Sequence, residues 1–272
     1  TPPDEPAYVE SLFGRLSFGW SPLHGWRERT RMFVEAPAPE LYDLVSDPRQ
    51  RQNLASARPD EVGRLQRIVR AAVASGVPAT PVSGSREVIE RLKGLGYVSS
   101  EPIASPSLRD PKDLVGVAER IEAAMADERI DPLGAIAEFR AVLADDPANP
   151  LARRRLALTL AGERRFEEAL AELRPLVAAG NAGAEGLTLL ADCLRLTGHA
   201  AEAVDAAREA SRADPRMAEG AVAEGRALVA AGRASEAGAA FERALTLAPG
   251  DPAALDGLAD LAIVAGDDFA AS

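Results

Sequence analysis

Residues of the same character recur every 34 positions in the second half of the chain. Alanine occupies one column at Ala135, Ala169, Ala203 and Ala237, and the position four residues later holds Phe139, Leu173, Ala207 and Phe241. Prolines close the period at Pro147, Pro215 and Pro249, with Asn181 in the remaining place. Glycines precede the alanine column, or its expected next place, at Gly198, Gly232 and Gly266. A fixed period of this length indicates a solenoid of repeated units.

Each period predicts two antiparallel helices, which we name the A-helix and the B-helix. A small residue in the alanine column lets the B-helix approach the A-helix closely. Proline then ends the B-helix, and glycine serves the left-handed turn between the two. The expected pairs cover residues 113–147, 150–181, 184–215 and 218–249. Pro252–Val264 is then a lone fifth A-helix, whose acidic residues solvate the end of the solenoid or mark a truncated chain: Asp251, Asp256, Asp260, Asp267 and Asp268.

This pattern resembles the tetratricopeptide repeat (TPR) over about Asp113–Asp267. The chain departs from the family at the usual tryptophan of the A-helix, where Glu119, Arg153, Leu187 and Ala221 stand. The family's A-helix glycine survives only as Gly225. The resemblance implies an α-solenoid over residues 113–272 whose A-helices line a concave face that binds a protein or peptide.

Four arginines fall at equivalent or nearby positions of successive A-helices: Arg120, Arg154, Arg195 and Arg226. One interpretation is that they are solvated surface residues. The other is a basic stripe that receives an acidic peptide, because arginine pairs bidentately with carboxylates. The lysine and asparagine clamp of some TPR proteins is not carried over, since Ala124, Leu158 and Asp192 stand where its asparagine would be.

The first hundred residues predict a small α+β subdomain. Short strands are expected at Tyr8–Phe13, as a pair within Trp26–Glu35, and at Leu41–Leu44. A helix is expected to begin at Pro59, with Val62, Leu65, Ile68, Val69 and Ala72 as its apolar face. A breaker-rich segment at 76–84, a second helix at Ser85–Leu95 and a linker at 99–112 follow. The fold class is therefore mainly α, a TPR-type α-solenoid preceded by a small α+β subdomain.

Several segments of residues 1–98 resemble the C-terminal subdomain of bacterial sulfatase-like hydrolases of the alkaline phosphatase superfamily. They are Tyr8–Ser11, Phe18–Ser21, Glu35–Pro37, Glu40–Leu44, Asp47-Pro48, Asn53–Ala55 and Arg91–Val98. The family usually has glycine in the hairpin turn and lysine on the returning strand, where this chain has Arg29 and Met32. The last segment resembles the end of that subdomain in versions that continue into TPR repeats.

This resemblance implies a parent that hydrolyses sulfate or phosphate esters with a divalent metal such as calcium, in an extracytoplasmic location. The family's Cys- or Ser-x-Pro-x-Arg nucleophile motif does not occur in this sequence. We therefore expect the chain alone to be inactive and to hold no cofactor. Under this resemblance, Phe18, Trp20, Ser21 and His24 are candidates for the rim of the parent's active site, and packing of their loop is the interpretation that the residues themselves favour. The alternative function is a non-enzymatic TPR adaptor.

Charge and composition disfavour several classes of binding partner. The formal charge is −11, of which residues 1–100 hold about +1 and residues 101–272 about −12. An acidic solenoid disfavours nucleic acid and anionic membranes. Cys193 is the one cysteine, so a disulfide within the chain and a Cys/His zinc site are not expected. We see no signal peptide and no membrane span, and interpret Thr1 as a cut or processed end, which leaves the localisation open.

Overall fold

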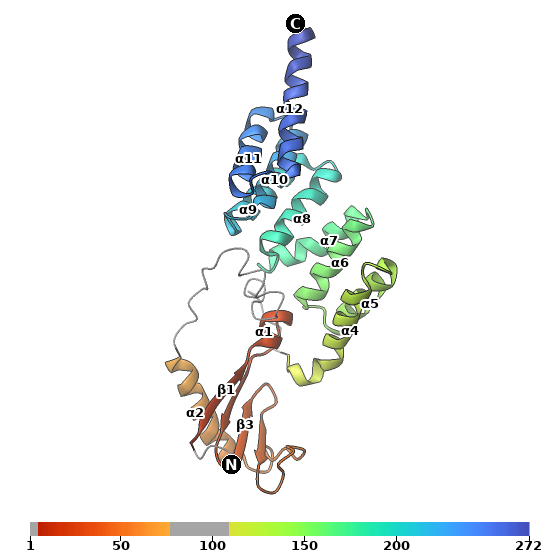
Figure 1. The fold of residues 1–272 in the computed structure, drawn as a ribbon. Coiled ribbons are helices and arrows are strands. Elements are labelled where there is room, and N and C mark those ends of the chain that lie inside the picture. Colours follow the sequence, from red (N-terminus) through yellow and green to blue (C-terminus); the bar gives the residue numbers. More distant parts are fainter. Residues whose placement is uncertain (1–4, 77–108, 272) are drawn as a thin grey trace. The chain divides into compact units, whose positions relative to one another are not determined.

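The computed structural model describes residues 5–76 and 109–271, with side chains described as far as residue 264 (Figure 1). The chain divides into two compact units, Thr1–Glu119 and Arg120–Ser272. The division falls inside helix α4 (Val115–Asp127). Most of the predicted linker 99–112 lies outside the described residues.

The first unit contains a four-stranded antiparallel sheet in the order β1-β2-β3-β4. The strands are β1 (Ala7–Ser11), β2 (Leu23–Arg27), β3 (Arg31–Glu35) and β4 (Glu40–Asp43). The register places Tyr8, Trp26, Phe33 and Leu41 in one row across all four strands. Because side chains alternate along a strand, this row lies on one face of the sheet.

Helix α2 (Pro59–Ser75) covers that face with its apolar stripe. Its Val62, Leu65 and Val69 are buried together with Phe33 and Leu41 in one hydrophobic cluster. Proline at the first turn, followed by Asp60 and Glu61, suits a helix start because these carboxylates lie at the positive end of the helix dipole. The predicted helix and its apolar face are confirmed.

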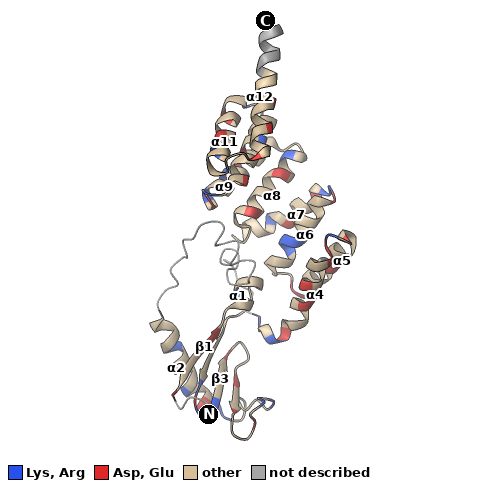
Figure 2. Ribbon diagram, viewed as in Figure 1, with Lys and Arg blue, Asp and Glu red and all other residues tan. Residues whose placement is uncertain are grey.

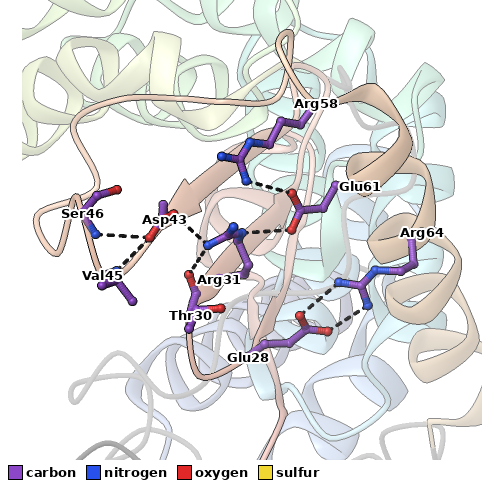
Figure 3. A network of polar contacts seen from close by, with 9 residues as sticks. All are labelled: Glu28, Thr30, Arg31, Asp43, Val45, Ser46, Arg58, Glu61 and Arg64. Atoms are coloured by element: carbon purple, nitrogen blue, oxygen red, sulfur yellow. Dashed lines mark hydrogen bonds and ion pairs between the residues drawn. The ribbon is translucent and has the colours of Figure 1, made fainter.

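Ion pairs surround this core and tie α2 to the sheet (Figure 3). Arg31 of β3 bonds Glu61 of α2 at 2.9 Å and Asp43 of β4 at 2.9 Å. Arg64 of α2 holds Glu28 in a bidentate pair with both N–O distances at 3.0 Å, and this hydrogen bonding lowers the pKa of Glu28. Such part-exposed pairs contribute about 0–1 kcal/mol each, so they orient the helix more than they stabilise it.

The predicted strands occur, with two differences. Strand β2 begins at Leu23, before the pair expected within Trp26–Glu35, because its pairing with β1 extends to Ser11. Phe13, expected in the first strand, instead begins a short helix, α1 (Phe13–Phe18), which Gly19 ends at a φ of +76°. The ring of Phe13 meets Phe18 edge-on at 5.6 Å, a local contact that the helical turn makes possible. The predicted segment at 76–84 and the helix at Ser85–Leu95 lie outside the described residues, apart from Gly76 at the end of α2.

Residues 109–114 pack on the first unit. Asp110 accepts a hydrogen bond from the backbone N–H of Ala38 at 3.1 Å and caps the short 3-10 helix η1 (Pro111–Leu114). Lys112 donates to the Ala38 carbonyl at 2.7 Å and pairs with Glu40 at 2.8 Å. The end of the predicted linker is therefore held against the sheet.

The second unit is a run of antiparallel helices, as the repeat predicts (Figure 1). After α4 come α5 (Pro132–Asp145), α6 (Pro150–Gly162), α7 (Phe166–Ala178), α8 (Gly183–Leu196), α9 (Ala200–Ala213), α10 (Ala218–Ala230), α11 (Ala234–Leu247) and α12 (Pro252–Ala271). The predicted helix pairs are α4/α5, α6/α7, α8/α9 and α10/α11. The fifth A-helix, α12, runs to Ala271 and not to the predicted Val264, so Gly266, expected in a turn, lies within it. The mainly helical solenoid with a small β-containing region before it is confirmed.

The repeated columns are the core of the solenoid. All four alanines of the alanine column and all four residues of the following column are buried. Gly198 and Gly232 have φ values of +87° and +72°, the left-handed conformation expected between the helices of a pair. The sequence columns therefore correspond to packing positions.

Phe241 of α11 occupies the tightest place in this core. A Cβ atom added to Gly225 of α10 would lie 2.5 Å from the Phe241 ring, and one added to Gly257 of α12 would lie 2.4 Å from it. Neither glycine has a positive φ, so it is the ring, and not the backbone conformation, that requires glycine at these two positions.

We expect Gly225→Ala to destabilise the solenoid by about 2 kcal/mol, because overpacking costs roughly 1–3 kcal/mol in a well-packed core. Gly238→Ala is the matched control, since a Cβ there meets nothing within 4 Å. In a helix this control should stabilise by up to about 1 kcal/mol. Urea denaturation followed by circular dichroism measures both. A smaller loss from Gly225→Ala in a Phe241→Leu background would identify the ring as the cause, and equal effects of the two alanines would contradict it.

Candidate peptide-binding groove

A groove of 330 Å³ opens along three successive A-helices of the second unit. Helix α8 contributes Arg195, and α10 contributes Arg226, Val229 and Ala230. The remaining lining residues are Phe241 of α11 and Ala253, Asp256, Gly257, Asp260, Leu261 and Val264 of α12. The sequence predicts that A-helices line the binding face, and this groove lies on them.

The groove combines a packed floor with exposed apolar walls. Phe241 is 1% exposed and reaches the lining where Gly257 has no side chain to cover it. Val229 and Val264 are 46% and 59% exposed, although both are β-branched apolar residues. Exposed apolar side chains gathered in a concave surface are typical of binding sites.

Charged side chains line the same groove and make few contacts of their own. Arg226, Asp256 and Asp260 are exposed, and no ion pair joins them to another residue in the described part of the chain. Arg195 pairs with Asp192 at 3.3 Å through one nitrogen, while its buried Nε has no hydrogen-bond partner among the described residues. Their hydrogen-bonding capacity is thus largely unused.

The four predicted arginines divide into two kinds. Arg195 and Arg226 share the groove. Arg120 instead bonds Glu138 at 2.5 Å and Asp145 at 2.6 Å on α5, and these hydrogen bonds raise its pKa. Arg154 is half-buried on α6, away from the groove lining. Of the predicted basic stripe, only Arg195 and Arg226 therefore lie in the groove.

Sequence reasoning missed that Asp256 and Asp260 belong to the groove, having assigned them to a solvating cap. The period itself carries the signal. Asp260 stands 34 residues after Arg226, and Asp256 stands 34 after Val222. The A-helix column that contains one groove cation therefore contains a groove anion one repeat later.

Elsewhere in the solenoid, opposite charges pair between neighbouring helices. Glu224 of α10 is only 7% exposed and accepts hydrogen bonds from Arg208 of α9 at 3.1 Å and from Arg243 of α11 at 2.5 Å. In Figure 2, acidic and basic residues are interspersed along these helices. Charged residues between neighbouring helices thus pair with one another. Arg226, Asp256 and Asp260 in the groove differ from them because they form no such pair within the described residues.

The predicted rim residues of the first unit are largely packed. Phe18 and Trp20 are 2% and 3% exposed and stack with ring centroids 4.3 Å apart. Ser21 and His24 line a shallow depression with Pro22, Glu35, Ala36 and Pro37. His24 Nδ1 lies 2.7 Å from the hydroxyl of Tyr8, whose pKa burial raises to about 12. No Ser21–His24 hydrogen bond occurs in the described first unit.

The described residues contain no group of three or more His, Cys, Asp or Glu side chains arranged to hold a metal ion. Among them, none of the helices has the length and apolar character needed to cross a bilayer.

Comparisons with known proteins place the second unit in a family. The tetratricopeptide repeat family matches residues 128–193, 188–252 and 222–271. A crystal structure of MamA protein has 20% identity and a TM-score of 0.51, covering 55% of this chain and 82% of that one. None of the curated proteins compared with the chain matches it.

Two further solved structures are similar at lower TM-scores. A thermophilic TPR protein of Thermus thermophilus has 22% identity and a TM-score of 0.46, covering 55% of this chain and 83% of that one. The second TPR domain of human RPAP3, solved with an HSP70 peptide, has 23% identity and a TM-score of 0.39, covering 40% of this chain and 91% of that one. At such identities a similarity shows the fold alone. Of these three structures, only that of MamA has a TM-score above 0.5 and supports the fold.

Cys193 of α8 should be unreactive in the folded protein. It is 1% exposed, and burial raises the pKa of its thiol to about 11. The thiolate is the reactive form, so at pH 8 its fraction is on the order of one in a thousand. We expect Ellman's reagent to label the native chain slowly at pH 8 and the urea-unfolded chain at once. Equal rates in the two states would contradict the burial.

Proposed function

Because residues 128–271 belong to the tetratricopeptide repeat family, we propose that this chain binds an extended segment of a partner protein in the groove of α8, α10 and α12. The fold itself suggests protein–protein interaction. The more specific proposal is that the peptide binds in this groove. The observation that carries it is that exposed Val229 and Val264 line the same groove as unpaired Arg226.

The groove suits a peptide in two respects. Its helices are fixed by the buried columns and by the Phe241 contacts, so a partner meets a surface that needs little reorganisation. Preorganisation of this kind lowers the entropic cost of binding. Its volume lies at the low end of the range for ligand sites, which favours one or two anchoring side chains over a large compact ligand.

We expect Val229→Glu to weaken peptide binding at least tenfold, a loss of about 1.4 kcal/mol, because it places a charge on the apolar wall. Peptides selected from a displayed library of random 12-residue sequences against the full chain serve as probes, and fluorescence anisotropy measures their affinity. Leu133→Glu on α5 is the control, since Leu133 is 61% exposed and lies outside the groove. Equal loss in both variants, or a library that yields no binder, would contradict the groove.

A second candidate concerns the first unit, which we propose to be the closing subdomain of a sulfatase-like hydrolase. What supports it is the sheet face opposite α2, which carries Val9, Leu23, Met32 and Val34. Val9 is 39% exposed and the other three are half-buried. An apolar sheet face requires a covering layer, which a larger catalytic domain would supply. The rival remains an adaptor in which this unit is a dedicated small domain.

The reading frame before Thr1 separates these two candidates. A Cys- or Ser-x-Pro-x-Arg motif followed by a large α/β pattern would support the hydrolase origin. A nearby initiator methionine would contradict it.

Under both candidates, the chain alone should not hydrolyse 4-nitrophenyl sulfate or phosphate above background with calcium, magnesium or manganese. The family's nucleophile motif is absent from these 272 residues. His24→Ala and His199→Ala provide the matched pair of variants for the assay. Turnover that His24→Ala abolishes and His199→Ala leaves intact would overturn the expectation and indicate an enzyme complete in this chain.

A further inference from the structure

We infer that the groove of α8, α10 and α12 selects a dipolar peptide: an apolar anchor with a carboxylate on one side and a lysine or arginine on the other. This inference rests on the proposed function of the groove and specifies the chemistry of its partner. It differs from the acidic peptide that the arginine positions alone predict.

The charges of the groove are separated by helix. Both cations, Arg195 and Arg226, come from α8 and α10, whereas both anions, Asp256 and Asp260, come from α12. Asp256 and Asp260 are one helical turn apart, so they share a face of α12. The groove therefore has a basic side and an acidic side.

The two sides do not neutralise one another. No ion pair within 4.0 Å links Arg226 to Asp256 or Asp260 in the described part of the chain. The same groove is also lined by apolar residues of α10 and α12, Val229, Ala230 and Ala253, and by the ring of Phe241. A ligand that spans the groove can thus meet cations on α8 and α10, anions on α12, and apolar surface in the same lining.

A peptide of one sign fits this arrangement poorly. An acidic peptide gains from Arg226 and places its other carboxylates against Asp256 and Asp260, within a half-chain whose charge is already about −12. A basic peptide meets the reverse conflict at Arg195 and Arg226. Like charges brought together on binding cost free energy, and this repulsion provides specificity against both.

Four synthetic peptides test the inference on the full chain by fluorescence anisotropy at about 0.1 M salt. All share a central Leu-Leu, and their flanking pairs are Glu-Glu before with Lys-Lys after, the reverse order, Glu-Glu on both sides, and Lys-Lys on both sides. We expect one dipolar order to bind at least tenfold more tightly than either peptide of a single sign. The preferred order would also give the direction in which the peptide lies.

Charge reversals identify the two sides. Arg226→Glu and Asp260→Lys should each weaken the preferred dipolar peptide about tenfold, and the double variant should prefer the opposite order. Arg212→Glu on α9, an exposed arginine outside the groove, is the control and should change nothing. A double variant that keeps the original preference would overturn the inference.

The outcomes separate the inference from the proposed function. If the Glu-flanked peptide binds as tightly as both dipolar ones, the groove binds peptides but the dipolar selection is wrong. The same holds if library-selected peptides bind and none of the four does. If neither the four peptides nor any library peptide binds, the proposed function fails with it.

Discussion

The ring of Phe241 meets Gly225 on α10 and Gly257 on α12 more closely than any side chain would allow. This contact sets how near α11 lies to the A-helices on both sides of it. The alanine column serves the same end, because Ala237 is fully buried where a larger residue would separate the pair. The same ring also forms part of the groove lining, so the packing that spaces the helices creates the floor of the candidate site.

Charge is distributed over the solenoid in two ways. Between neighbouring helices it is matched, as at Glu224 with Arg208 and Arg243, and Arg120 with Glu138. In the groove, Arg226, Asp256 and Asp260 take part in no ion pair within the described part of the chain. Since both kinds occur on similar helices, the contrast reflects which side of the A-helix a residue occupies. That difference distinguishes the candidate groove from the rest of the solenoid surface.

Much of the solenoid was predictable because its columns recur. Ala203 and Ala237 are buried as the period requires, and Pro252 begins the fifth A-helix. In the first unit the strands could be predicted from their alternating residues. The helix that begins at Phe13 could not, because a short helix with one aromatic contact leaves no periodic signal in the sequence.

The candidate site was less predictable than the fold. Arg195 and Arg226, which the A-helix positions group together, both line the groove. These positions did not reveal that Arg120 is held by α5, since that depends on which B-helix residues lie across from it. The role of Asp260 was hidden for another reason: a terminal helix with many carboxylates has an ordinary explanation in solubility.

The acidic side of the groove belongs to α12, and this position has a consequence for affinity. A repeat array behaves as a chain of nearest-neighbour couplings, so the docking of α12 depends chiefly on its contacts with α10 and α11. A groove from which α12 is undocked would lack Asp256 and Asp260, and the apparent dissociation constant would rise in inverse proportion to the docked fraction. Binding of the proposed ligand and docking of α12 would therefore be thermodynamically linked, so that the ligand also stabilises the contacts of α12 with α10 and α11.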